Sequence, residues 1–524
     1  MTFTSPIHDV DIPDVSVYEA IFARTGEWPD RPAMIDGLTG KRLSYRELLG
    51  MVDKVAAALA ERGIGKGDVV AIFSPNTPYY AVLFHGVLRA GGIATTINSL
   101  YTPAEIAHQL RDSRAIMLFT ISPFLDRAKA AVAADGVGVR EIVVLDGADG
   151  HSSLADLLAT EAAPPDVVIN PAEDLAVLPY SSGTTGLAKG VMLTHRNIVA
   201  NILQKQAMAP MTGQTRILAV LPFFHIYGMT IIMNCGLAAG STIVTMPKFE
   251  LVDFLKVIAE YRTDRVYIAP PVAVALAKHP MIDEYDLSAI DMLFSGAAPL
   301  DEELAGLVRK RLGCRIRQGY GMTEASPLTH AIPGDRDDIP VGSVGLLAPN
   351  MQARLVDPGT GEDVGVGERG ELWLRGPNIM KGYLNNQEAT AATIDGEGWL
   401  HTGDVAIVDK EGVYSIVDRV KELIKYKGYQ VPPAELEALL LTHPKIADAA
   451  VIGVLDGEGE EIPKAFVVLQ PGADLSADEV IGFVADRVAP HKKVRAVEFI
   501  ETIPKSASGK ILRKDLRARQ AATA

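Results

Sequence analysis

The sequence predicts an α/β fold: a large N-terminal domain of parallel-rich sheets with helices and a β subdomain, followed by a small α+β C-terminal domain. Three observations support this prediction. The chain has 524 residues, too many for one hydrophobic core. Helical and strand-like patterns alternate through residues 40–135 and again through 216–246 and 265–294, which indicates parallel strands joined by helices. After about residue 340 the segments become short and are separated by glycine and proline.

The first predicted elements follow one another closely. Ser44 and Glu47 have the spacing of a capping box, so we expect a helix from there to about Arg62. The apolar run 69–73 predicts a buried strand that ends at a Ser-Pro-Asn turn. A helix over 79–90 and a strand over 93–97 continue the alternation.

The later elements predict a β subdomain and then a compact tail. Residues 370–375 and 413–417 have strand patterns. In the tail we expect helices over 433–441 and 477–488 and strands over 449–454 and 465–470. We place a domain boundary near Lys421, which divides the chain into domains 1–420 and 421–524.

Composition excludes several classes of protein. The 50 lysine and arginine residues against 65 aspartate and glutamate residues give a net charge of −15, so we expect no nucleic-acid partner. Cys235 and Cys314 lack metal-ligand spacing, which favours two reduced, buried thiols. No signal peptide and no membrane-length apolar run is evident, so we expect a cytoplasmic protein without stable membrane insertion.

The segment Ser181–Gly190 is rich in glycine and hydroxyl groups and contains one lysine. Glycines allow backbone N–H groups to approach an anion, and hydroxyls and an ammonium group complete a phosphate cradle. It is not a Walker loop, because Lys189 is followed by glycine and a strand-like run rather than by Ser or Thr and a helix. The alternative, an ordinary flexible hairpin, stays open at this point.

Three further motifs are expected in loops that follow strands, where open α/β sheets bind ligands. In the segment 318–324, two glycines around Tyr320 form a flat slot suited to a purine, and Thr323 and Glu324 suit a phosphate and Mg²⁺. Asp404 could accept both ribose hydroxyls, and Arg419 could pair with the same ribose or with a phosphate. In the segment 504–510, small residues surround Lys510. Alone, each would be an ordinary turn, cap or surface charge.

Together, in this order and spacing from about Tyr45 to Lys514, the motifs resemble the adenylate-forming superfamily of acyl-CoA synthetases, standalone adenylation domains and beetle luciferase. Within it, the segments 221–227 and 318–325 are most similar to those of 4-coumarate:CoA ligases. The resemblance implies an acid–thiol ligase. A carboxylate attacks the α-phosphorus of MgATP to give acyl-AMP and pyrophosphate, and coenzyme A then displaces AMP.

The resemblance implies roles for the nucleotide residues. Glu324 would bind Mg²⁺, Asp404 and Arg419 would hold the ribose, and Lys510 would bridge the acyl carboxylate and the α-phosphate. The full nucleotide set is Ser181, Ser182, Gly183, Thr184, Thr185, Gly186, Lys189, Gln318, Gly319, Tyr320, Thr323, Asp404, Arg419 and Lys510. Thr185 is counted among the catalytic residues.

The resemblance also implies a mobile C-terminal domain that rotates about a hinge at Lys421. Rotation would withdraw Lys510 and bring Lys425 and Gln430 to the thioester-forming face, with Lys427 and Gly428 at coenzyme A. His225 would gate the acyl site. Lys510 also resembles the acetylation site of bacterial members, which implies a regulatory acetyltransferase as a partner.

The acid itself is less defined. Its pocket should be lined by Tyr227, Thr230, Ala269, Phe294, Gly296, Gly319, Gly321, Pro327 and Leu328. The glycines should leave room for a planar ring, which favours a hydroxycinnamate or a related aromatic acid. Phe294 and Thr230 depart from the plant pattern of lysine and asparagine, which makes one wall more apolar. A medium- or long-chain fatty acid, loading of a carrier protein, and a non-catalytic nucleotide-binding regulator remain as alternatives.

Overall fold

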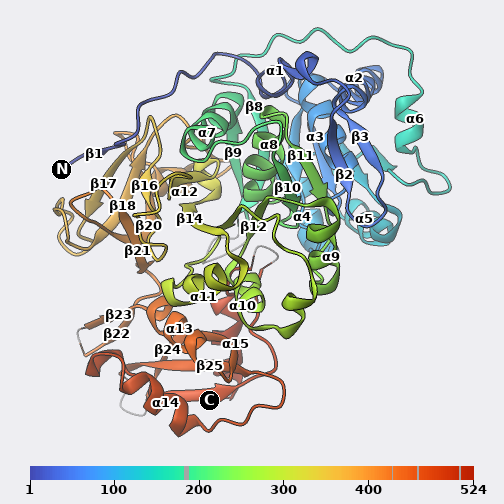
Figure 1. The fold of residues 1–524 in the computed structure, drawn as a ribbon. Coiled ribbons are helices and arrows are strands. Elements are labelled where there is room, and N and C mark those ends of the chain that lie inside the picture. Colours follow the sequence, from blue (N-terminus) through green and yellow to red (C-terminus); the bar gives the residue numbers. More distant parts are fainter. Residues whose placement is uncertain (182–187, 428, 457–459, 507–508, 524) are drawn as a thin grey trace.

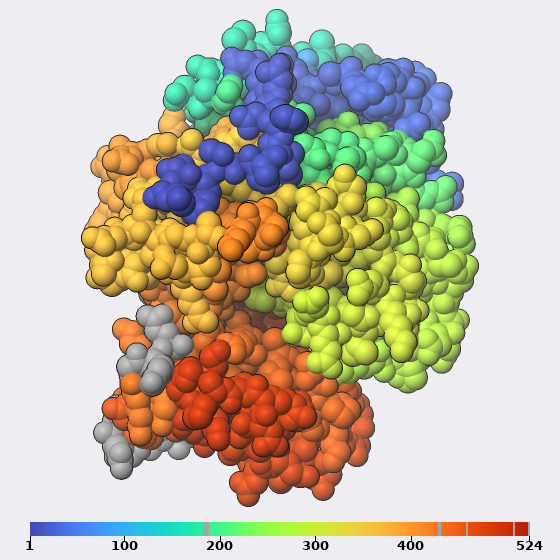
Figure 2. All heavy atoms as spheres, turned by 60° about the vertical axis from the view of Figure 1, so that its left-hand side comes forward, coloured from blue at the N-terminus to red at the C-terminus, as the bar shows by residue number. Residues whose placement is uncertain are grey.

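The computed structural model describes residues 1–181, 188–427, 429–456, 460–506 and 509–523. Three large sheets form an N-terminal body, and a smaller C-terminal lobe lies beneath it (Figure 1). Figure 2 shows this lobe, in orange and red, projecting below the yellow and green body. The predicted fold class is confirmed.

A nine-stranded sheet forms the centre of the body, in the order β16-β15-β14-β13-β12-β10-β11-β2-β3. The six strands from β14 to β2 are parallel, and antiparallel strands close both edges. The bounds are β2 Pro32–Asp36, β3 Arg42–Ser44, β10 Arg216–Ala219, β11 Thr242–Thr245, β12 Arg265–Ile268, β13 Met292–Ser295, β14 Arg315–Gly321, β15 Leu328–Ala331 and β16 Leu346–Leu347.

A seven-stranded sheet lies beside it, in the order β19-β9-β8-β5-β4-β6-β7. Five strands are parallel, whereas β8 and β9 form an antiparallel pair and β19 extends it. The bounds are β4 Val69–Phe73, β5 Ile93–Thr96, β6 Met117–Thr120, β7 Glu141–Val144, β8 Leu175–Ser181, β9 Lys189–Thr194 and β19 Gly382–Tyr383.

Helices pack between and around these sheets because their apolar faces need cover. The capping box at Ser44 and Glu47 is confirmed at the start of α2 (Tyr45–Glu61), which packs on α3 (Pro78–Arg89) inside the largest core. The other helices of the body are α1 Val17–Phe22, α4 Pro103–Ser113, α5 Leu125–Val132, α6 Leu154–Leu158, α7 His195–Met208, α8 Cys235–Ala238, α9 Leu251–Tyr261, α10 Pro270–Lys278, α11 Glu302–Leu312 and α12 Gln387–Thr393. Short 3₁₀ helices are η1 Thr25–Glu27, η2 Ser122–Phe124, η4 Pro280–Glu284 and η5 Thr323–Ala325, and η3 Tyr227–Asn234 is a π-helix.

Two other expectations can be compared with these elements. Cys235 and Cys314 are buried and free, as predicted. Among the helices of the described residues, none combines the length and the apolar character that crossing a bilayer requires.

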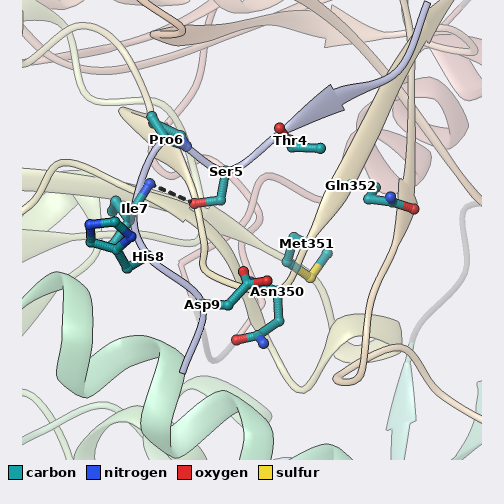
Figure 3. Close-up of a pocket in the computed structure, with 9 residues that line it drawn as sticks. All are labelled: Thr4, Ser5, Pro6, Ile7, His8, Asp9, Asn350, Met351 and Gln352. Atoms are coloured by element: carbon teal, nitrogen blue, oxygen red, sulfur yellow. Dashed lines mark hydrogen bonds between the residues drawn. The ribbon is translucent and has the colours of Figure 1, made fainter. Parts of the chain in front are cut away.

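The predicted β subdomain is a five-stranded antiparallel sheet in the order β1-β17-β18-β20-β21. The bounds are β1 Phe3–Thr4, β17 Gln352–Val356, β18 Gly370–Arg375, β20 Leu400–Val408 and β21 Tyr414–Arg419. The segment after β1 crosses the residues before β17 and leaves a recess there (Figure 3). Asn350 fastens this crossing, because its side chain both accepts from Val10 N and donates to Val10 O.

The C-terminal lobe has cores of its own, built from residues 424–516. Its strands are β22 Ile424–Tyr426, β23 Tyr429–Val431, β24 Ile446–Leu455, β25 Glu461–Leu469 and β26 Ala496–Phe499. Its helices are α13 Pro433–Thr442, α14 Ala477–Ala485, η6 Pro490–Lys492 and α15 Arg513–Thr523. The predicted tail elements are confirmed, although α14 ends three residues before the predicted Val488.

Candidate active site

The glycine-rich segment joins β8 to β9, and both flanking strands are confirmed. Because the two strands are antiparallel, Ser181 and Lys189 lie opposite each other at the base of this connection. The ammonium group of Lys189 lies 4.4 Å from the centre of the Tyr383 ring. The predicted residues Ser182, Gly183, Thr184, Thr185 and Gly186 lie outside the described residues.

The carboxylate of Glu324 accepts hydrogen bonds from residues of two strands, β8 and β19. Its side chain is buried in η5, and its Oε1 accepts hydrogen bonds from Ser181 Oγ at 2.9 Å and from Tyr383 OH at 2.8 Å. Burial, followed by the charge of Glu324, raises the pKa of Tyr383, so this phenol stays a donor. Tyr383 was not identified from the sequence, because a tyrosine in a two-residue strand carries no signal until β19 pairs with β9.

Asp404 and Arg419 form the second part of the site. They are directly opposite in β20 and β21, and Arg419 Nε lies 3.2 Å from Asp404 Oδ1. Tyr320 OH donates to the other carboxylate oxygen, Oδ2. Thr323, half-buried in η5, follows Tyr320 by three residues.

The expected loop positions of these motifs are wrong for Gly319, Tyr320 and Asp404. The strand β14 continues to Gly321 because Gly319 and Tyr320 pair with β15, and Asp404 lies inside β20. Backbone pairing with a neighbouring strand extends each strand past its apolar run, which periodicity alone does not predict. The side chains therefore project from rigid strands.

The side chain of Gln318 has a structural role. It is buried; its Oε1 accepts from Leu300 N, and its Nε2 donates to Val341 O at 2.8 Å and to Ser343 O at 3.0 Å. Both ends of the side-chain amide are therefore engaged within the protein, and the expectation that Gln318 flanks adenine stays a prediction.

Lys510 reaches this site from the C-terminal lobe. It is half-buried and lies within electrostatic reach of Glu324, Asp404 and Arg419. Burial and the positive charge of Arg419 lower the pKa of Lys510 to about 8, against the opposing effect of the two carboxylates. The charges of the two predicted carboxylates therefore act on the predicted catalytic lysine.

His225 lies on the same side of the body as Lys510. Burial and the positive charge of Lys510 lower the pKa of His225 to about 4, so its imidazole is neutral near pH 7. Its Nδ1 accepts a hydrogen bond from Tyr227 N at 3.3 Å. This turn connects the predicted gate to the first residue of η3, which the acyl prediction also names.

The residues predicted for the second half-reaction lie elsewhere in the C-terminal lobe. Lys421 is exposed in the turn after β21, and Lys425 and Lys427 are exposed on the hairpin of β22 and β23. This hairpin lies apart from α10 and α15 in Figure 1. Lys425 pairs with Gln430 through the backbone, whereas Gly428 and the side chain of Gln430 are outside the description.

The predicted acyl residues gather around an aromatic cluster. Tyr227 donates from its OH to Phe294 O at 3.4 Å, and the Tyr267 ring lies 6.2 Å from that of Tyr227 and 5.7 Å from that of Phe294. Buried members of the predicted set are Tyr227, Thr230, Ala269, Phe294, Gly296, Pro327 and Leu328. Within the described residues, the buried hydroxyl of Thr230 has no hydrogen-bond partner.

The prediction that Gly296, Gly319 and Gly321 leave room for a planar ring is wrong on the side where a Cβ would project. A Cβ on Gly296 would lie 2.9 Å from the Tyr227 ring, and one on Gly319 would lie 2.8 Å from the Phe294 ring. A Cβ on Gly321 would lie 2.2 Å from Pro327 O. These glycines let the protein pack against itself, so the space on that side is already filled by the Tyr227 and Phe294 rings and by the Pro327 carbonyl group.

Comparison with protein families matches most of the chain. The family described as AMP-binding enzyme matches residues 21–384, and the AMP-binding enzyme C-terminal domain matches residues 435–510. A probable 4-coumarate–CoA ligase 1 from Dictyostelium discoideum is 41% identical over 98% of this chain and 97% of its own length. The 4-coumarate:CoA ligase 1 of Petunia hybrida is 42% identical over 100% of this chain and 97% of its own length.

Solved structures show the same architecture. The anthranilate CoA ligase AuaEII in complex with anthranoyl-AMP superposes with a TM-score of 0.90 at 26% identity, covering 98% of this chain and 99% of that one. MatB from Rhodopseudomonas palustris is 29% identical over 97% of this chain and 99% of its own. The TM-score is 0.87 for its ATP-bound form and 0.78 for its apo form.

Proposed function

This chain belongs to the AMP-binding enzyme family, and on that premise we propose that it joins an aromatic carboxylic acid of the hydroxycinnamate class to coenzyme A. The chain is an ATP-dependent carboxylate–CoA ligase that acts through an acyl adenylate. The acid and ATP give acyl-AMP and pyrophosphate. The thiol of coenzyme A then attacks the acyl carbon, and AMP leaves as the thioester forms.

The first step joins two anions, so its main requirement is positive charge at the reacting oxygens. Lys510 is the residue that we assign to this role, between the acid carboxylate and the α-phosphate. The observation that carries the assignment is the position of the preceding residue, Gly509, where an added Cβ would lie 2.8 Å from Ala269 Cβ of the body. The charges of Glu324 and Asp404 also act on Lys510, although it belongs to the other lobe. Arg419 is oriented by its contact with Asp404.

The nucleotide is proposed to enter as MgATP. Within the described residues, both donors to the Glu324 carboxylate bind Oε1. One oriented carboxylate fits Mg²⁺, which binds proteins through one or two carboxylates and keeps phosphate oxygens and waters as its other ligands. Asp404 would accept the ribose hydroxyls, and Thr184, Thr185 and Lys189 would bind the β- and γ-phosphates.

For the second step we propose that domain 421–524 rotates about Lys421. The separate hydrophobic cores of the two lobes support this division of the chain. Lys425 and Gln430 would then face the thioester-forming side, and Lys427 and Gly428 would contact coenzyme A. His225, neutral near pH 7, would gate the acyl site without adding charge to it.

The aromatic class of the acid is supported by the rings of Tyr227, Tyr267 and Phe294 and by the names of the similar ligases. Apolar pockets distinguish acids by only about 1–3 kcal/mol per missing group. A fatty acid is therefore the second candidate substrate class, and a carrier protein is an alternative acceptor to coenzyme A.

One screen tests these assignments. Pyrophosphate release is measured with MgATP and a panel of hydroxycinnamic, benzoic and fatty acids, with and without coenzyme A, and thioesters are identified by mass spectrometry. We expect acid-dependent release and a CoA thioester, with the highest kcat/KM for a hydroxycinnamate. A preference for fatty acids would overturn the proposed acid. Acyl-AMP that accumulates without forming a CoA thioester would overturn the assignment of coenzyme A as the acceptor.

We also propose that an acetyltransferase regulates the enzyme at Lys510. Acetylation would remove the positive charge that the first step requires. Mass spectrometry after incubation with a protein acetyltransferase and acetyl-CoA should find acetyl-Lys510 and a parallel loss of pyrophosphate release. Loss of activity without modification of Lys510 would contradict the proposal.

A further inference from the structure

The helix α10 contacts the C-terminal lobe at both of its ends. At its start, Gly509 packs against the body, because a Cβ there would lie 2.8 Å from Ala269 Cβ and 3.9 Å from Pro271 Cδ. Gly509 has a φ of +83°, so both its conformation and its contact favour glycine. Lys510 follows directly, and this contact therefore sets where the catalytic lysine enters the site.

At its other end, α10 finishes with Lys278, which binds two carbonyl groups at the end of α13 and the carbonyl group of Ile446 at the start of β24. The Nζ of Lys278 donates to Leu441 O at 2.8 Å and to His443 O and Ile446 O at 3.3 Å. The last carbonyls of a helix have no partner within the helix, and the negative end of the helix dipole lies there. A lysine from the body thus supplies donors and a positive charge to a helix of the other lobe.

Apolar packing accompanies this contact. Leu441 belongs to the lobe, yet its side chain packs against both the core around α10 and α11 and the core of its own lobe. In Figure 1, α10, α11 and α13 lie together where the body meets the lobe. The contact is therefore a small interface, with Lys278 as its charged component.

We propose that Lys278 is a positioning residue for the first half-reaction: by binding the end of α13, it holds the C-terminal lobe where Lys510 reaches Glu324 and Asp404. The inference rests on the proposed function, since it gives Lys278 a role in adenylate formation. It differs from the catalytic assignments, because the Lys278 ammonium group binds carbonyl groups of the other lobe and would act through the placement of Lys510.

The chain superposes to different degrees on two structures of one related protein. The present arrangement is more similar to the ATP-bound form of MatB than to its apo form, with TM-scores of 0.87 and 0.78 at the same 29% identity. The ATP-bound and apo structures of MatB therefore differ in how closely they superpose on this chain.

The test uses Lys278→Met, which keeps the length of the side chain but removes its charge and donors, and Lys278→Arg, which retains both. Lys256→Met, at an exposed lysine of α9, is the matched control. Losing a hydrogen bond to a charged group changes an equilibrium constant by about ten- to a hundredfold. We expect Lys278→Met to lower kcat for acid-dependent pyrophosphate release by about tenfold, with little change in the KM of ATP. Thioester formation from supplied acyl-AMP should be unchanged or faster.

A second measurement does not depend on activity. Spin labels at Lys256→Cys and Lys514→Cys report the distance between the lobes, and both native cysteines are buried. We expect one narrow distance distribution in the otherwise unmodified chain and a broad or double one after Lys278→Met, with Lys278→Arg restoring the narrow one. An unchanged distribution would overturn the proposal even if no acid is activated. Equal loss in both half-reactions would also overturn it, whereas inactive unmodified enzyme would contradict only the proposed function.

Discussion

Asp404 and Arg419 face each other across β20 and β21, with Arg419 Nε 3.2 Å from Asp404 Oδ1. The strand pairing holds both side chains on a rigid backbone. The phenol of Tyr320 donates a hydrogen bond to the other carboxylate oxygen of Asp404, Oδ2. The Asp404 carboxylate is therefore an oriented acceptor beside the Arg419 guanidinium, which lies on β21, the last strand before the C-terminal lobe. This relationship links the proposed nucleotide site of the body to the segment about which the lobe is proposed to turn.

Replacing Asp404 with asparagine should raise the KM of ATP by at least about tenfold, because a charged acceptor for the ribose is lost and Arg419 loses its partner. The KM of the acid should change little. Initial rates of pyrophosphate release give both constants. Glu411→Gln, at the exposed turn between the same strands, is the control. Equal increases in both KM values would contradict a ribose role for Asp404.

The pH dependence of adenylate formation should follow Lys510. Burial lowers its pKa to about 8, so the positive charge is present below that pH and is lost as the pH rises through it. We expect kcat/KM for pyrophosphate release to fall above about pH 8, since this constant reports groups of the free enzyme. Lys510→Arg keeps its charge to a much higher pH and should remove the fall. A fall that persists in Lys510→Arg would assign it to another group.

Removing the charge of Lys510 separates the two half-reactions. We expect Lys510→Ala to abolish pyrophosphate release and to spare thioester formation from supplied acyl-AMP and coenzyme A. Lys514→Ala, at an exposed lysine of α15, should affect neither. Equal loss of both half-reactions in Lys510→Ala would refute two separate arrangements of the lobe.

The packing around Gly319 predicts a stability effect. A Cβ there meets the Phe294 ring at 2.8 Å and His330 O at 2.9 Å, so Gly319→Ala should destabilise the body by about 1–3 kcal/mol. Adding Phe294→Leu should recover part of this loss, because only the ring can withdraw. Urea unfolding of the single and double variants measures the coupling. Purely additive effects would show that the ring does not oppose the new methyl group.

Local structure was largely predictable from the sequence. The apolar run 69–73 before Ser-Pro-Asn became β4 with the same bounds, and the capping box at Ser44 began α2 as expected. These signals act over a few residues, through burial of apolar side chains and satisfaction of helix-end N–H groups. The order of the nucleotide motifs could also be recognised from the sequence, and it indicated the family that the comparisons identified.

Partners distant in the chain could not be assigned in the same way. Tyr383 reaches Glu324 across 59 residues, and Lys278 reaches Leu441 across 163. The side chain of Gln318, a residue that the motif assigned to adenine, donates to Val341 O and Ser343 O, 23 and 25 residues further along the chain.

The chain by itself therefore determined which segments become strands and helices and which chemical groups it carries, because both depend on residues close in sequence. Only the tertiary structure decided which of those groups meet. Strand register and the seating of one lobe on the other depend on packing summed over the whole molecule, and no short stretch of sequence contains that sum.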